Sequence, residues 1–347
     1  MAVIALNALD TLFFRDGKPF SMGEETWANG LFPPPLSVLY GALRTAYFSE
    51  HIGELKLANE EGDPTSELRI NFSAYHAEGK YFYPCPLDIV QKKERKSERE
   101  PEFSLLELVE RQADCFSSLY GVDLPMQLQS QAQVEEASGL IDEISLNEYL
   151  QSSSVPPDLL NTDNFLQDEP KVGIGRNDRT GASDEGMLYR VGMKRMHRLR
   201  LAVGYSCLTL SGTLMRLGGE GKSVSVSELT EKPNVQEPEP FPKTGDFFKL
   251  YLATPAIFKE GWRPTSETVP GAKLVAAVVG KPLHIGGFDM KPKNGQRSQP
   301  KPMRRAVPAG SVYYYQGTAE VQGNSISDYG KEQGYGIYYI GNVSKGV

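Results

Sequence analysis

The sequence predicts an α+β fold with antiparallel sheets, arranged in two domains, and three observations lead to this prediction. Segments typical of strands dominate the 347 residues, with few helical patterns among them. A chain of this length is too long for one typical domain, and its 39% of apolar residues can fill two ordinary cores. Residues 231–243 carry four prolines, which makes them the best candidate for an interdomain linker.

The first elements are a strand and a helix. Residues 3–14 are apolar and could be a strand or a signal peptide. Because Asp10 interrupts them and they lack the basic leader of a signal peptide, they predict a strand. The three prolines at 33–35 keep the chain extended, since proline fixes its own φ and disfavours helix in the residue before it. Apolar residues then recur at helical spacing over residues 36–48, with Ser37 as the expected N-cap.

A hairpin and an insertion follow. Residues 69–84 predict two aromatic-rich strands joined by a turn at 77–80, which gives β-α-β-β, the first two-thirds of a ferredoxin-like unit. Residues 90–170 leave this pattern, because they are charged, polar and at most helical. We interpret them as an insertion that covers one side of the first domain. The strand pattern resumes over 187–210, where charged and apolar residues alternate at 197–203 as in a half-exposed strand.

Four strand-like segments follow the linker, at residues 247–258, 273–288, 306–316 and 334–343. They predict a second, smaller sheet domain, for which a ferredoxin-like order is one option. The expected domains are therefore 1–230, which contains the insertion, and 244–347.

Charge is distributed unevenly along the chain. The net charge of −7 argues against a nucleic-acid-binding protein. Residues 131–170 hold nine acids and no Lys or Arg, whereas residues 291–305 hold six bases and residues 190–200 hold five, both without an acid. A phosphate backbone meets this local field rather than the total. Each basic segment could be only a solvated loop, but flexible basic loops also wrap single strands of nucleic acid.

We therefore expect RNA contacts from the basic side chains of these segments and of a long loop over 172–190. We expect the 291–305 loop to be mobile alone and ordered only against phosphates, since it lacks any apolar periodicity. The candidates are Arg176, Arg179, Lys194, Arg195, Arg198, Lys291, Lys293, Arg297, Lys301, Arg304 and Arg305.

Two glycine-rich segments look like nucleotide-binding or RNA-binding motifs. The stretch LGGEGKSVSV at 217–226 lacks the spacing of a phosphate-binding P-loop, and a strand pattern follows it where a helix is required. It predicts a tight turn between two strands, whose bare N–H groups could face an RNA phosphate. The stretch GYGIYYIG at 334–341 resembles the aromatic stacking motif of RRM sheets, but Gln333 and Ile337 do not fit it. A buried strand between glycine turns is favoured.

Catalytic and metal-binding motifs are not evident. None of the four histidines lies in a recognisable triad, although His51, just past the first helix, could act as general base in a metal-independent ribonuclease. The cysteines Cys85, Cys115 and Cys207 are odd in number and far apart, which predicts a reducing compartment and no paired zinc ligands. The longest later apolar run is too short to span a membrane. We expect a cytoplasmic protein without metal or cofactor.

Six blocks of sequence carry a resemblance to a known family, and they cover most of the chain outside residues 90–170. In order they are LDTLFFRDGKPF, LFPPPLSVLYGALRTAY, VGIGRNDRTGASDEGMLY, LGGEGK, TPAIFKEGWRP and VPAGSVYYY. Together they resemble the RAMP-superfamily subunit of the type III-B CRISPR Cmr effector complex that partners the large polymerase-like subunit.

The resemblance implies two ferredoxin-like (RRM-like) domains and no catalysis of its own. It also implies an antiviral effector in which the subunit holds the 5′ handle of the CRISPR RNA beside the large subunit and a neighbouring RAMP backbone subunit. Direct contact with DNA or a membrane is not expected. The glycine-rich segments of RAMP proteins correspond most closely to Gly218, Gly219 and Gly221 and to Gly334, Gly336 and Gly341.

Two other functions stay open at this point. One is a CRISPR RNA-processing endoribonuclease on the same scaffold, with His51 as general base. The other is a pure protein scaffold whose basic loops bind an acidic partner. Trp27 and Trp262 lie among glycines or prolines rather than in strand patterns, and we expect them at a partner interface. A tryptophan is about equally often a core residue.

Overall fold

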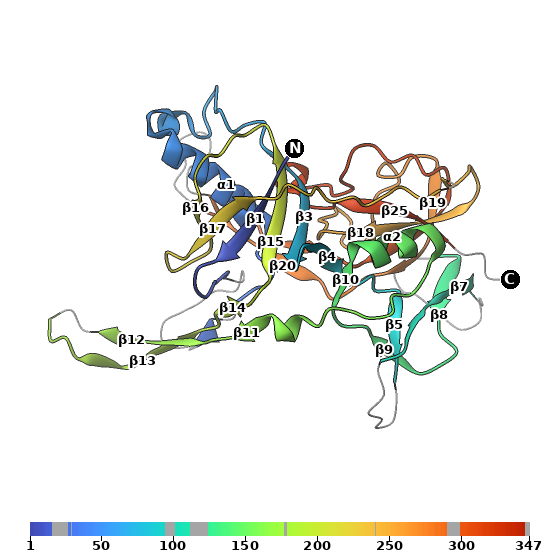
Figure 1. The fold of residues 1–347 in the computed structure, drawn as a ribbon, viewed down its shortest axis with the longest axis horizontal. Coiled ribbons are helices and arrows are strands. Elements are labelled where there is room, and N and C mark those ends of the chain that lie inside the picture. Colours follow the sequence, from blue (N-terminus) through green and yellow to red (C-terminus); the bar gives the residue numbers. More distant parts are fainter. Residues whose placement is uncertain are drawn as a thin grey trace.

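The computed structural model describes residues 1–15, 27–28, 30–93, 101–111, 124–176, 179–239, 241–289 and 299–343. Two antiparallel sheets, one of seven strands and one of four, organise the molecule, and few helices accompany them (Figure 1). The predicted α+β class is confirmed. Strands of the larger sheet come from residues 2–228, and those of the smaller sheet come from residues 247–342.

The larger sheet contains a split β-α-β unit. Its strands, in spatial order, are β10 (Leu140–Asp142), β4 (Lys80–Pro84), β3 (Arg69–Ala77), β15 (Arg200–Ser206), β1 (Ala2–Ala8), β17 (Ser223–Glu228) and β16 (Leu214–Arg216). Strand β15 lies between β1 and β3 and is antiparallel to both. Strands β1 and β3 therefore run parallel, and helix α1 (Leu36–Glu50) connects them. This arrangement is ferredoxin-like.

The hairpin of residues 69–84 is confirmed, but its second strand does not lie between the two helix-connected strands, as the third strand of a ferredoxin-like unit does. Glu78 and Gly79 form its turn with φ of 49° and 78°, the left-handed values that a two-residue hairpin turn requires. Strand β4 lies outside β3, and β15 fills the position next to β1. Burial explains the difference, because β15 is buried on both faces whereas β4 alternates between buried and half-exposed residues.

The expectation of a half-exposed strand at 197–203 is wrong, because β15 begins only at Arg200 and is buried. Arg198 has a φ of 54°, which interrupts the chain between β14 (Lys194–Met196) and β15. The alternation of charged and apolar residues spans this break.

Helix α1 confirms the predicted apolar stripe and corrects its cap. Pro35 is the N-cap, and its carbonyl accepts from the N–H groups of Val38 and Leu39 at 2.8 and 3.3 Å. The extended prolines thus end directly at the helix, so Ser37 lies inside the first turn and caps nothing. Five helix residues are buried, and the first four of them pack in the core of the larger sheet: Leu36, Leu39, Ala42, Leu43 and Phe48.

The smaller sheet repeats the strand arrangement of the larger one. Its order is β19 (Ala272–Val278), β24 (Val312–Gly317), β18 (Phe247–Leu252) and β25 (Tyr338–Asn342), all antiparallel. Strand β24 separates β18 from β19, as β15 separates β1 from β3. The connections 253–271 and 318–337 contain no α-helix, only the short η5 (Lys331–Gln333). They still cover the sheet, because Phe258, Val269 and Ile326 join its core.

A shared core joins the two sheets. The face of the larger sheet opposite α1 packs against Tyr251 and Tyr314 of the smaller sheet and against helix α2 (Glu143–Ser152). Fully buried Asp88 accepts hydrogen bonds from Tyr149 (2.7 Å) and Tyr314 (2.5 Å) at this junction. Buried Lys249 lies 3.4 Å from the centre of the Tyr149 ring, and desolvation lowers its pKa to about 8.

The insertion at 90–170 was expected to be at most helical, and this expectation is wrong. It forms the small sheets β6 (Phe103–Leu105), β5 (Ile89–Lys92), β9 (Val134–Glu136) and β7 (Glu107–Glu110), β8 (Met126–Gln129), besides η3 (Thr162–Asn164). Its strands are short and most of its acids lie on exposed positions, so its polar composition did not indicate strands. Strand β8 contacts β19 and thereby covers an edge of the smaller sheet.

Several short ribbons complete the fold. They are β11 (Leu166–Asp168) with β14; β12 (Lys171–Arg176), β13 (Ser183–Val191) and β2 (Trp27–Ala28); β20 (Leu283–Ile285) with β23 (Arg304–Ala306); and β21 (Phe288–Asp289) with β22 (Gln299–Pro300). The β12–β13 hairpin projects far from the body (Figure 1). A 3₁₀ turn, η1 (Ile52–Leu57), follows α1. The expectation of one flexible loop over 291–305 is wrong for residues 299–300 and 304–305, which pair with residues 288–289 and 284–285.

Candidate nucleic-acid interface

The ribbon of β20–β23 and β21–β22 brings basic residues to the surface while its other side is anchored. Leu283 and Ile285 pack against the core of the larger sheet, and Ala306 is buried in it. The residues between them in the strands, His284 and Arg305, are directly opposite each other and exposed. Period-two alternation therefore anchors this ribbon on one face and exposes its polar groups on the other.

The three bases of the described part of this segment differ in their environment. Arg304 is half-buried, and its guanidinium carbon lies 3.5 Å from the centre of the Tyr329 ring, a cation–π contact. Lys301 and Arg305 are exposed, and neither forms an ion pair with a residue that the structure describes. Their charges are thus available to a phosphate. Lys291, Lys293 and Arg297 lie outside the described residues.

The bases of the 190–200 segment have acidic partners. Lys194 pairs with Asp168 at 2.7 Å, and Arg195 pairs with Asp10 at 3.0 Å and with Glu169. The Arg195 guanidinium donates hydrogen bonds to the Glu169 carboxylate, which lowers the pKa of Glu169 and raises that of Arg195.

Asp10 joins this cluster to the glycine turn. Its carboxylate also pairs with Lys222 at 2.5 Å, and this bond, with that of Arg195, lowers the pKa of Asp10 to about 2. Lys171 pairs with Glu220 of the same turn at 3.0 Å. Four bases and four acids therefore balance around the base of the β12–β13 hairpin. We name this set, which consists of Asp10, Asp168, Glu169, Lys171, Lys194, Arg195, Glu220 and Lys222, the ion-pair cluster.

The remaining arginine candidates lie around this hairpin. Arg198 is exposed and makes no hydrogen bond or ion pair with a described residue. Arg179 is exposed at the hairpin turn, and Arg176 ends strand β12. Val172 and Ile174 of β12 are also exposed, so the hairpin presents apolar as well as basic groups.

The glycine turn 217–222 has a packing role. It links β16 to β17, which confirms the predicted turn between two strands. The N–H of Gly219 donates to the Phe13 carbonyl at 2.8 Å and is therefore not bare. A Cβ on Gly218 would lie 2.6 Å from the same carbonyl, and its φ is 86°, so only glycine fits there.

The tryptophans expected at an interface are placed differently. Trp262 is half-buried against the core of the smaller sheet, and its carbonyl accepts from the Tyr313 hydroxyl at 2.6 Å. The backbone of Trp27 pairs with Arg190 of β13. The strand expected within 334–341 is β25, which begins only at Tyr338 and is mostly half-buried rather than buried, with Gly334 and Gly336 at positive φ before it.

His51 lies in a shallow site without a cationic neighbour. Its ring stacks on Tyr47 at 4.2 Å, and Nδ1 is 3.0 Å from the Tyr47 carbonyl oxygen. The residues that line this pocket are Tyr47, Glu50, His51, Pro64, Cys207, Leu208, Thr209 and Ser211. No Lys or Arg is among them, although stabilising the oxyanion of RNA cleavage calls for a cation.

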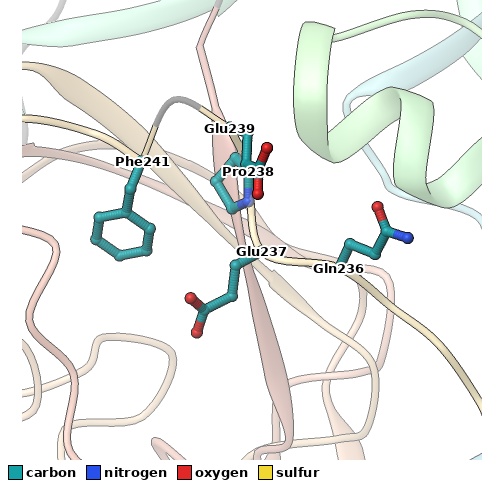
Figure 2. Close-up of a pocket in the computed structure, with 5 residues that line it drawn as sticks. All are labelled: Gln236, Glu237, Pro238, Glu239 and Phe241. Atoms are coloured by element: carbon teal, nitrogen blue, oxygen red, sulfur yellow. The ribbon is translucent and has the colours of Figure 1, made fainter.

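A second pocket lies at the predicted linker and is acidic. It is lined by Gln236, Glu237, Pro238, Glu239 and Phe241 (Figure 2). Side chains of α2 hold the linker, since Asn147 donates to the Asn234 carbonyl (3.0 Å) and Gln151 to that of Glu237 (2.9 Å). Two carboxylates beside the pocket would repel a phosphate backbone.

Two further properties concern membranes and metals. In the described ranges, no helix is long and apolar enough to cross a membrane. Within the same part of the chain, no three His, Cys, Asp or Glu side chains are grouped so that they could hold a metal ion. Of the cysteines, Cys85 is buried and Cys207 is exposed, both as free thiols, and Cys115 lies outside the described residues.

Sequence reasoning missed Tyr329, Phe288 and the acids of the ion-pair cluster. Phe288 could have been found, because only Asp289 and Met290 separate it from the basic segment. Tyr329 and Asp10 carry no local signal, since their partners Arg304 and Arg195 lie far away in the sequence.

Comparisons with known proteins agree with this fold. The family model of the CRISPR-associated protein (Cas_Cmr3) matches residues 4–343. No curated protein is similar enough to count as a match. A chain in the cryo-EM structure of the Type III-B Cmr-beta bound to cognate target RNA is similar with a TM-score of 0.52 and 15% identity, over 90% of this chain and 86% of that chain. A chain in the structure with target RNA and AMPPnP, state 1, gives 0.50 and 14% over the same shares. At these identities the likeness shows the fold.

Proposed function

This chain belongs to the Cas_Cmr3 family of CRISPR-associated proteins, as the sequence resemblance predicted, and from this premise we propose its role within a Cmr complex of type III CRISPR-Cas interference. The protein is a non-catalytic RNA-binding and scaffolding subunit of a type III-B complex. It binds the 5′ handle of the CRISPR RNA and docks the large polymerase-like subunit in antiviral defence. A neighbouring RAMP backbone subunit is its second protein partner.

The β20–β23 ribbon carries the RNA-binding part of this proposal. Lys301 and Arg305 are exposed and lack acidic partners among the described residues, while the opposite face of the ribbon is anchored in the core. When unpaired cations of a protein bind phosphates, they displace the counterions that are condensed on the nucleic acid, and this release favours binding. The overall charge of −7 opposes RNA, so the isolated chain binds it weakly and firm binding requires the partner subunits.

A double substitution tests this proposal. Lys301→Ser with Arg305→Ser removes two phosphate contacts and no core contact, so the assembled complex should form but load about tenfold less CRISPR RNA at physiological salt. The slope of log K for RNA binding against log salt concentration should become shallower by about 1.4, since each phosphate contact on single-stranded RNA contributes about 0.7 to this slope. The measurement is RNA retained per complex across a salt series.

The matched control is Lys259→Ser with Lys273→Ser, which removes two exposed lysines elsewhere in the second half of the chain. It should load RNA like the wild type. Equal loading by both double variants at every salt concentration would contradict the proposal.

The proposed role includes no catalysis by this chain. Purified protein incubated with CRISPR repeat RNA should leave the RNA intact, because the His51 pocket has no cation to stabilise a pentavalent phosphorane. Specific cleavage that disappears in His51→Ala would overturn this part and favour the endoribonuclease.

Docking of the large subunit is tested through Trp262. The side chain is only half-buried, so part of its ring can be covered by a partner. Trp262→Ala should reduce co-purification with the large subunit more than it lowers the melting temperature. A large loss of melting temperature with normal co-purification would make Trp262 a core residue alone.

A further inference from the structure

Two exposed aromatic rings stand out against the buried ones. Among the Phe, Tyr and Trp side chains that the structure describes, only Phe241 and Phe288 are exposed, by 41% and 53%. Phe241 lies in the acidic pocket beside Glu237 and Glu239 (Figure 2). Phe288 lies on the basic ribbon instead. Exposing an aromatic ring to water is unfavourable, so an exposed ring can mark a binding site. The charges around the two rings differ, so the rings suit different ligands.

The ribbon places a cation next to Phe288. Phe288 is directly opposite Pro300 in the β21–β22 pair, and Lys301 follows Pro300. The Lys301 N–H donates to the Gly287 carbonyl at 2.9 Å, and its side chain passes close to Gly287. The ring and the ammonium group therefore belong to neighbouring positions of one small surface.

An irregularity in the ribbon orients this surface. Ile285 pairs with Arg304 and Phe288 with Pro300, so residues 286–287 face residues 301–303 and the second strand has one extra residue. Such a bulge bends a strand and redirects its side chains. Lys301 and Met303 in this bulge are both exposed.

The chemistry of this surface matches single-stranded nucleic acid better than an apolar protein face. Residues 281–289 and 299–306 hold four Lys or Arg and one acid, Asp289. Only Phe288 and Met303 are large exposed apolar side chains there, too few for the core of a protein interface. A ring beside cations stacks on a base while the cations bind the phosphates that flank it, and in a duplex the base faces are covered.

We infer that Phe288 is a stacking platform for an unpaired RNA base, with Lys301 and Arg305 on the adjacent phosphates. This inference rests on the proposed RNA-binding function and adds to it that the ribbon binds single-stranded rather than paired RNA.

The test compares bases with backbone. Binding of the full-length chain at low salt is measured by fluorescence anisotropy with a mixed-sequence single-stranded RNA and with the same oligonucleotide in abasic form. Phe288→Leu keeps an apolar side chain but removes the aromatic face. It should weaken binding of the normal oligonucleotide about fivefold or more and leave binding of the abasic one unchanged. Phe288→Trp should restore the affinity.

Phe241→Leu is the matched control, because it removes the other exposed ring, which lies in an acidic pocket, and it should change neither affinity. Unchanged binding of both oligonucleotides by Phe288→Leu, or an equal loss for both, would overturn the stacking role. If Phe288→Leu instead binds RNA normally and loses a protein subunit on purification of the complex, the ring docks a protein.

The outcomes also separate this inference from the proposed function. If Lys301→Ser with Arg305→Ser weakens binding but Phe288→Leu does not, the RNA site stands without stacking. If the wild-type chain binds neither oligonucleotide at low salt, both the proposed function and the stacking role fail.

Discussion

The two most basic segments of this chain have opposite electrostatic environments. In residues 190–200, Lys194 and Arg195 are held by Asp168, Glu169 and Asp10 in the ion-pair cluster. In residues 299–306, Lys301 and Arg305 have no acidic partner among the described residues. Both segments look alike as strings of bases without acids. What distinguishes them is the chain beside them: Asp168 of β11, Glu169 and Asp10 lie against β14, whereas β23 pairs with the uncharged strand β20.

The largest effect should come from releasing the paired bases. Replacing Asp10 and Asp168 with Asn and Glu169 with Gln leaves Lys194, Arg195 and Lys222 without partners. The full-length chain should then bind single-stranded RNA about tenfold more tightly at low salt. The slope of log K against log salt concentration should become steeper by up to about 2. Anisotropy titrations at several salt concentrations measure both quantities.

The matched control removes the same number of charges outside the ion-pair cluster. Glu148→Gln, Asp158→Asn and Asp163→Asn are exposed acids of the insertion without an ion pair to a described residue. If this control gains as much affinity, total charge rather than local pairing governs RNA binding, and the comparison of the two segments fails.

A smaller effect is expected when the paired bases are removed. Lys194→Ser with Arg195→Ser should change CRISPR RNA loading of the assembled complex less than about threefold, because these cations already neutralise acids. It should lower the unfolding free energy only slightly, because exposed ion pairs are screened by solvent. RNA loading reduced as far as in Lys301→Ser with Arg305→Ser would show that RNA displaces the acids.

A modest effect is expected at the third base of the exposed ribbon. Tyr329→Leu removes the ring under Arg304 and should lower the unfolding free energy by about 0.5–1 kcal/mol. RNA loading should hold, since the Arg304 charge remains. Chemical denaturation measures the first quantity, and a loss of RNA loading without a loss of stability would assign Tyr329 to the RNA site.

The smallest effect concerns pH. Lys222 and Arg195 hold the pKa of Asp10 at about 2, below its ordinary 3.8. The stabilising contribution of Asp10 is therefore complete above about 4 and is lost as the pH falls from about 4 towards 2. A carboxyl-carbon NMR titration should give this low midpoint, and Lys222→Ser should raise it. A midpoint near 3.8 in the wild type would mean that the cluster does not form in solution.

Much of the local structure was predictable because neighbouring residues determine it. The stripe of α1, the turn at Glu78 and Gly79 and the glycine turn at 217–222 all follow from spacing and from backbone preferences of a few adjacent residues. The family resemblance rests on such blocks as well. For the candidate site, the sequence alone identified the basic segment that contains Lys301 and Arg305.

Only the tertiary structure decided which strand lies beside which, and therefore which charges are paired. The position of β15 between β1 and β3, the bond of Asp10 to Arg195 and the stacking of Arg304 on Tyr329 all join residues far apart in the sequence. These contacts depend on burial of whole strand faces and on packing between elements, and no local pattern encodes them. The sequence by itself determined where the bases are, and the fold determined which of them remain exposed to RNA.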